Sequence, residues 1–69
     1  MADEDQPDAR IEEAARILVR EYGDAALVIA SVTADEMIAK RDQPGLSTWL
    51  LIRAAVRRRL RNSTGAYGQ

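Results

Sequence analysis

The sequence of 69 residues contains no cysteine and no histidine. The absence of cysteine excludes disulfides and thiolate metal sites, and the absence of histidine removes the most common metal ligand and the most common acid–base side chain. No segment reaches the roughly 18 apolar residues of a membrane-spanning helix, and the acidic start MADEDQPD is unlike a signal peptide. We therefore expect a soluble cytoplasmic protein with neither a metal nor another cofactor.

The short chain also limits how much stability a core can supply. A chain of this length forms one domain at most, and its core barely outweighs the entropy lost on folding. Ordering about 55 residues costs roughly 80 kcal/mol at roughly 1.5 kcal/mol each, which a small core only just offsets. Because disulfides and metals are excluded, oligomerisation and unusually good helix packing are the remaining remedies.

The net charge of -1 conceals a separation of charge along the chain. The first thirteen residues carry one arginine, Arg10, and six acids, which are Asp3, Glu4, Asp5, Asp8, Glu12 and Glu13. The segment from Pro44 onward carries no acid and five arginines, which are Arg53, Arg57, Arg58, Arg59 and Arg61. Such a separation is typical of a basic binding surface and equally of two complementary ends of one assembly. Residues 1–7 are expected to form a disordered acidic head.

The first helix is expected over residues 8–22. Asp8 is a suitable N-cap, and Gly23 is a suitable left-handed C-cap. The apolar residues between them recur at helical spacing and are Ile11, Ala14, Ala15, Leu18 and Tyr22. A spacing of four residues also predicts an ion pair between Glu12 and Arg16.

The second helix is expected over residues 25–41, with Asp24 as its N-cap. It opens with AALVIASV, in which apolar side chains point in nearly every direction. Such a helix must be covered on all sides. We therefore expect the third helix or a second copy of the protein to cover what the first helix leaves open, and Val28 and Val32 are interface candidates.

The third helix is expected over residues 44–61, with Asp42 or Gln43 as its cap, Ser47 as an alternative later cap, and Asn62 as its stop. Its core seam consists of Trp49, Ile52, Val56 and Leu60, which lie within about 80° of each other on a helical wheel. Together with the first helix, the expected core anchors are Leu18, Tyr22, Trp49, Ile52, Val56 and Leu60. Leu50 and Leu51 fall outside the seam and are further interface candidates. Residues 62–69 are expected to form a flexible tail.

A sparse pattern of residues runs from the first helix to the end of the third. It consists of Leu18, Tyr22-Gly23, Ala26, Ala30, Asp42, Gly45, Trp49, Ile52, Ala55-Val56 and Leu60. In this pattern, over about residues 14–61, the chain resembles a family of short helical proteobacterial proteins of unknown function. The resemblance implies a small all-helical fold and implies no activity. Pro44 departs from the family's pattern near the start of the third helix.

Catalytic residues are not expected in this sequence. It has no G-x-S-x-G motif and no glycine-rich phosphate loop. The acid pairs Glu12-Glu13 and Asp35-Glu36 are neighbours in sequence, so their side chains point to different parts of a helix surface. Asp35, Glu36 and Asp42 match no metal-binding spacing. We therefore expect a protein that is not an enzyme and has no catalytic, cofactor or metal site.

The arginines of the third helix are the candidate anion contacts. Arg53, Arg57 and Arg61, spaced by four residues, form a stripe with Arg58 and Arg59 beside it, and together they could neutralise several phosphates. Two features oppose nucleic-acid binding: a pI of about 5.3, and the absence of base-reading asparagine, glutamine or serine near the middle of this helix. The arginines could instead cover apolar surface with their stems, favour the helix C-terminus, or pair with the acidic head.

The combined prediction is an all-α bundle of three helices, completed by homodimerisation, that acts as a non-catalytic protein–protein interaction or regulatory module. The candidate interface consists of Val28, Val32, Leu50 and Leu51. The alternative is a nucleic-acid-binding protein, and its candidate contacts are Arg53, Arg57, Arg58 and Arg61. An interfacial membrane helix built on Trp49 is disfavoured, because the core needs most of that apolar face.

Overall fold

The fold is that of a computed structural model, which describes the backbone of residues 7–68 and the side chains of residues 9–62. The described residues form three helices, α1 (Pro7–Tyr22), α2 (Ala25–Lys40) and α3 (Gln43–Gly68). The predicted all-α architecture of three helices is confirmed. Of the predicted acidic head, residues 1–6 lie outside the described residues.

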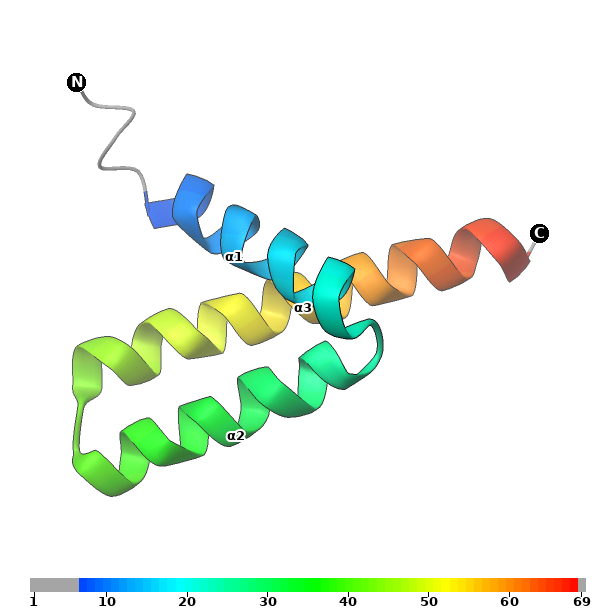
Figure 1. Cartoon of the computed structure of the whole chain (residues 1–69). Helices are drawn as coiled ribbons and strands as arrows, with labels where there is room; N and C mark the ends of the chain where they lie inside the picture. Colours follow the sequence, from blue (N-terminus) through cyan, green and yellow to red (C-terminus); the bar gives the residue numbers. More distant parts are fainter. Residues whose placement is uncertain (1–6, 69) are drawn as a thin grey trace.

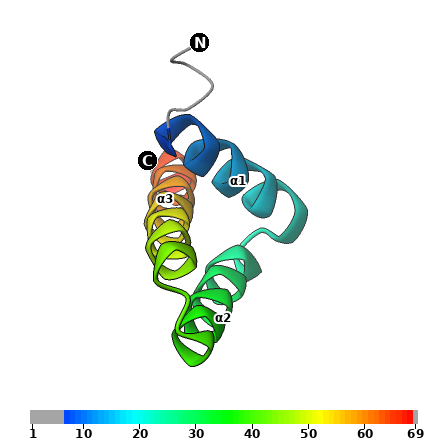
Figure 2. The same cartoon turned by 90° about the vertical axis from the view of Figure 1, so that its left-hand side faces the viewer.

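The longest helix, α3, holds the other two together. α2 runs antiparallel beside the first half of α3, and α1 crosses α3 nearer its C-terminal half (Figures 1 and 2). The backbone measures 41 × 33 × 17 Å. One helix with its side chains is about 10–12 Å wide. The smallest dimension of the molecule, 17 Å, therefore corresponds to a thickness of about two helices. Each helix therefore keeps an outward face.

Glycine supplies the first turn, as predicted. Gly23 has φ +58°, and its N–H donates to the Val19 carbonyl at 2.8 Å, which ends α1 with a left-handed residue. Asp24 occupies the predicted N-cap position of α2, but its side chain does not make the expected capping hydrogen bond. Asp24 already has helical dihedrals, φ −61° and ψ −28°, and its side chain makes no cap bond within the described part of the chain. An N-cap side chain usually reaches the helix N–H groups from an extended backbone instead.

The second turn uses Arg41 and Asp42. Arg41 adopts the left-handed conformation at φ 60°, and its N–H donates to the Ile38 carbonyl at 3.0 Å. The Asp42 carboxylate then accepts the Gly45 N–H at 2.9 Å, so Asp42 is the cap of α3, one of the two predicted. A Cβ at Gly45 would lie 2.7 Å from the Asp42 carboxylate and 2.6 Å from Met37 Sδ, so a side chain there would displace this cap.

The end of α3 differs from the prediction. The helix was expected to stop near Arg61 and Asn62, but its backbone remains helical to Gly68. No proline follows Arg61, and asparagine, serine and threonine reduce helix propensity without forbidding the helix. The side chains of the predicted tail after Asn62 lie outside the described side chains.

The core is built mainly of small side chains. The structure describes eight buried residues, which are Ile11, Ala15, Ala26, Ala30, Ala34, Ile52, Ala55 and Val56. Five of these are alanines, and Val56 is the largest of them to be fully buried. Alanines at every fourth position line one side of α2, which lets neighbouring helices approach closely but buries little apolar area per residue. The described core is therefore small even for a chain of this length.

Five of the six predicted core anchors contribute to this core. Ile52 and Val56 are buried, and a further three are partly buried and pack against the core, namely Leu18, Trp49 and Leu60. The prediction for Tyr22 is wrong, because its side chain is 54% exposed. Tyr22 has the correct helical spacing, but it is the last residue of α1 and lies beyond the turns of α1 that pack in the core.

Candidate interaction surfaces

The outward side of α2 exposes large apolar side chains. Val28 is 62% exposed and Val32 is 50% exposed. Each lies two positions from a buried alanine, which is about 200° around a helix, so both point away from the buried side. Ala25 and Ala39 are exposed on the same side of the helical wheel. We call these four residues the α2 outer face.

The α2 outer face is also poor in polar groups. The segment from residue 25 to residue 34 contains no charged residue, and its polar residues are Ser31 and Thr33. The Thr33 hydroxyl donates to the Ile29 carbonyl of its own helix at 2.8 Å, so its hydrogen-bonding capacity is partly used within α2. Ile38, beside this face, is 58% exposed. From Ala25 to Val32 no charge interrupts this apolar surface, which is typical of a contact site.

The outward side of α3 combines leucine with arginine. Leu50 is 39% exposed and lies about 160° around the helix from the buried Ile52. Arg57 and Arg61 are exposed and, at seven and eleven residues after Leu50, lie on nearly the same side of the helix. We call these three residues the α3 outer face. It is apolar at one position and strongly positive over the next turns.

The four predicted interface residues therefore do not share one surface. α2 and α3 lie side by side (Figure 2) and pack against each other through their inner sides. Val28, Val32 and Leu50 are on the outer sides of their helices, so the two valines face away from Leu50. Leu51 is 52% exposed and belongs to neither outer face. It lies at a surface hollow of about 300 Å³ between α1 and α3, which is lined by Ile11, Glu12, Leu51, Ala54 and Arg58.

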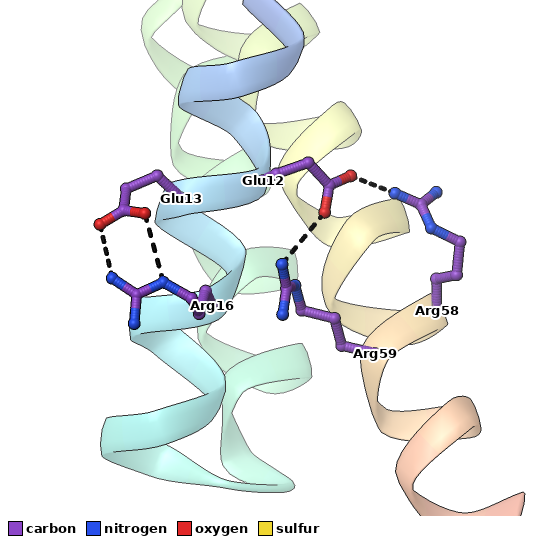
Figure 3. Close-up of polar contacts among 5 residues, drawn as sticks. All are labelled: Glu12, Glu13, Arg16, Arg58 and Arg59. Atoms are coloured by element: carbon purple, nitrogen blue, oxygen red, sulfur yellow. Dashed lines mark hydrogen bonds and ion pairs between the residues drawn. The ribbon is translucent and has the colours of Figure 1, made fainter.

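One carboxylate joins α1 to the arginines of α3. Glu12 accepts hydrogen bonds from Arg58 through one oxygen and from Arg59, at 3.4 Å, through the other (Figure 3). The side chains of Arg58, Arg59 and Glu12 are 53%, 37% and 42% exposed. The Nε of Arg59 is buried and has no hydrogen-bond partner among the described residues. The guanidinium of Arg59 is therefore held between the helices and depends on Glu12 for its pairing.

The predicted ion pair between Glu12 and Arg16 is wrong. Arg16 instead donates from Nε and Nη2 to the two oxygens of Glu13, at 3.2 and 2.6 Å, on the side of α1 away from α3 (Figure 3). These hydrogen bonds and the charge of Arg16 lower the pKa of Glu13, and the same contacts raise the pKa of Arg16. Because α1 crosses α3 at Glu12, this acid is within reach of the arginines of another helix, which the spacing within α1 could not indicate.

Three of the predicted anion contacts keep their charges available. Within residues 9–62, no hydrogen bond or ion pair involves the guanidinium of Arg53, Arg57 or Arg61. Arg57 and Arg61 are exposed, whereas Arg53 is partly buried. Arg58, the fourth candidate, already pairs with Glu12. Arg59, which the sequence places beside the stripe, also pairs with Glu12.

The described part of the chain holds neither a candidate metal site nor a candidate membrane span. It contains no group of three acidic, histidine or cysteine side chains placed to hold a metal ion. Over the same residues, no helix is both long enough and apolar enough to span a membrane.

No family model, no curated protein and no solved structure matches this chain. The resemblance to short proteobacterial helical proteins thus stays a prediction, carried by residues such as Asp42, Gly45 and Trp49.

Proposed function

We propose that this protein is a small non-catalytic interaction module of the cytoplasm, whose exposed apolar side chains bind another protein, most simply a second copy of the chain. One observation carries the proposal. In the described part of the chain, five of the eight buried side chains are alanines, whereas Val28, Val32 and Leu51 are at least half exposed. Full burial of a valine or leucine side chain contributes about 1.5–3 kcal/mol, so a partner that covers these residues adds stability that the small core does not supply.

The charged residues of α2 favour a specific contact over non-specific hydrophobic association. The α2 outer face has charged residues at its two ends, Asp24 and Lys40, and one acid, Asp35, between Val32 and Ala39. An apolar patch rimmed by polar groups is typical of protein–protein contact sites. These charges favour partners that present opposite charges and disfavour partners that present like charges.

Sedimentation equilibrium tests the proposal directly. The chain is measured from low micromolar to near-millimolar concentration, and the apparent mass is expected to rise from 7.6 kDa towards twice that value. Two double variants place charges on the exposed apolar side chains of α2 and of α3, respectively: Val28→Glu with Val32→Glu, and Leu50→Glu with Leu51→Glu. One of these double variants is expected to stay monomeric. A 7.6 kDa mass for the unmodified chain at every concentration would contradict self-association.

The alternative function is nucleic-acid binding through α3. The observation in its favour is that Arg53, Arg57 and Arg61 have no acidic partner within the described residues. Three phosphate contacts would give a slope of about −3 for log affinity against log salt on duplex DNA. Anisotropy of a labelled random duplex, and of an RNA strand, measures this slope, and Arg57→Glu with Arg61→Glu should abolish binding. No binding at low salt would set this function aside.

A further inference from the structure

We infer that two copies of this chain associate through their α2 outer faces, with the two α2 helices antiparallel and Val32 on the two-fold axis. The inference rests on the proposed self-association and adds to it the helix, the orientation and the register. It follows from three features of the described residues, which are the spacing of the exposed side chains on α2, the order of charges along α2, and the positive charge of α3.

The exposed residues of α2 repeat at intervals of three and four. The stripe reads Ala25, Val28, Val32, Asp35 and Ala39. Alternating intervals of three and four keep residues on one side of a helix and are the spacing by which two helices pack along their length. Alanine at both ends and valine in the middle let two such stripes approach closely. The inner alanines of α2 already pack in the core, so this second stripe is the side that remains for another helix.

The order of charges along α2 selects the orientation. In the antiparallel pair centred on Val32, residues at equal distances before and after Val32 face each other, so Asp24 of each copy faces Lys40 of the other. Ala25 likewise faces Ala39. A parallel pair would instead place Asp24, Glu36 and Lys40 each opposite its own copy, and like charges in such contacts are destabilising.

The same charges select the register. If the antiparallel pair is shifted so that Val28 faces Val32, Glu36 of each copy comes opposite Asp24 of the other, and Lys40 lies beyond the N-terminus of the other copy's α2. Both ends of the contact would then hold like charges. The register centred on Val32 has opposite charges at both ends. Between these ends, the charged residues are Asp35 and Glu36, which come opposite Ile29 and Val28 of the other copy and, being exposed, can turn towards the solvent at the edge.

The α3 outer face is unsuited to contact with its own copy. A two-fold contact uses the same patch on both subunits. Arg57 and Arg61 would then lie against the arginines of the second copy, and α3 contains no acid from Gln43 to Gly68 to compensate them. The α2 outer face carries no such penalty, because residues 25–34 are uncharged and the register centred on Val32 places Asp35 and Glu36 opposite apolar residues of the other copy, not opposite its acids. The two outer faces therefore have different roles in an assembly, and α2 is the one that self-associates.

Single cysteines test this geometry, because the chain has none of its own. Facing helices with axes about 8–10 Å apart bring the two Cα atoms on the axis close enough for a disulfide. Val32→Cys is expected to form a disulfide-linked dimer rapidly under mild oxidation at a concentration where the unmodified chain is dimeric. Leu51→Cys is the matched control, since Leu51 is 52% exposed and Val32 is 50% exposed, and it should cross-link much more slowly.

A charge exchange tests the register independently. Asp24→Lys and Lys40→Asp should each weaken the dimer about fivefold at low salt, because each single variant replaces two opposite-charge contacts by like-charge contacts. The double variant Asp24→Lys/Lys40→Asp restores opposite charges and should recover most of the lost affinity. Sedimentation measures the dissociation constants. Failure of the double variant to recover affinity would contradict the register.

The outcomes separate this inference from the proposed function. If the unmodified chain dimerises but Val32→Cys cross-links no faster than Leu51→Cys, the α2 contact is wrong while self-association stands. If the unmodified chain is monomeric at every concentration, the proposed self-association itself is wrong. Val32→Glu should give a folded monomer, and Ile17→Glu, at another exposed apolar residue, should leave the dimer intact. Circular dichroism confirms that both variants remain helical.

Discussion

The two sides of α2 are both apolar, but they differ in the size of their side chains. The inner side presents Ala26, Ala30 and Ala34, which are at most 2% exposed, and the outer side presents Val28 and Val32, which are at least 50% exposed. Most proteins bury valine and leave much of their polar surface outside. A helix that places its small apolar residues inside and its larger ones outside is built to contact neighbours on both sides. The fold supplies the inner neighbours, and the outer one is the partner that we propose.

Enlarging a side chain on the inner side of α2 is expected to have the largest effect. Ala30→Leu adds three carbons where the side chain is fully buried, so α2 must move away from its neighbours, at a cost of about 3 kcal/mol. In a domain of this size that cost is comparable with the total stability. Urea unfolding at concentrations where the chain is monomeric measures the change. Ala9→Leu, at an exposed position of α1, is the control and should change stability by less than about 0.5 kcal/mol.

The same valine-to-alanine substitution can be made at a buried residue and at an exposed residue, which compares the contributions of the two sites to stability. Val56→Ala removes two methyl groups from a fully buried side chain, which should cost about 2 kcal/mol. Val28→Ala removes the same groups from a side chain that is 62% exposed and should cost less than about 0.5 kcal/mol in the monomer. Equal losses of stability in urea unfolding would show that Val28 is covered in the monomer and would remove the basis of the α2 outer face.

The contact between α1 and α3 is held partly by charge, in contrast to the contact between α2 and α3. Glu12→Gln removes the carboxylate that pairs with Arg58 and Arg59, and we expect a loss of about 0.5–1 kcal/mol that shrinks at high salt. Thermal unfolding at low and high salt measures both effects. Glu36→Gln, at an exposed position of α2, is the control in the monomer. A loss that is independent of salt would show that Glu12 acts by packing and not by charge.

The smallest effect is expected at Glu13, whose side chain is 57% exposed. Arg16 lowers the pKa of Glu13 below its ordinary value of 4.5, so the ionised form is favoured in the folded chain. The stability that this pair contributes is therefore fully present above pH 4.5 and is lost as the pH falls through the lowered pKa. Glu13→Gln should lower the melting temperature slightly at neutral pH and not at strongly acidic pH. A difference that grows as the pH falls would contradict this sign.

Much of the fold could be predicted from the sequence. Gly23 marks the first turn, and Asp42 caps α3, because a left-handed glycine and a capping carboxylate are local requirements of helix ends. The spacing of Ile52 and Val56 likewise predicts their burial. Tyr22 and the end of α3 could not be predicted in this way. The periodicity of Tyr22 matches the core, but whether its side chain is buried depends on how the helices cross.

The candidate surfaces were predictable only in part. The exposure of Val28, Val32, Leu50 and Leu51 follows from apolar residues that the expected core does not need. Their division between two opposite sides of the molecule does not follow from the sequence. A helix that is apolar all round shows no preferred side, so its pattern cannot say which residues face inward.

By itself, the sequence determined the helices, the two turns and the presence of more apolar side chains than one small core can hold. The helices and turns depend on interactions between residues that are close in the chain, and the surplus of apolar side chains follows from composition. The tertiary structure alone decided that the alanines of α2 face inward and its valines outward, and that Glu12 pairs with Arg58 and Arg59 instead of Arg16. The reason is physical, since the inward side of an all-apolar helix and the partner of an acid on a crossing helix are set by distances between segments far apart in the sequence.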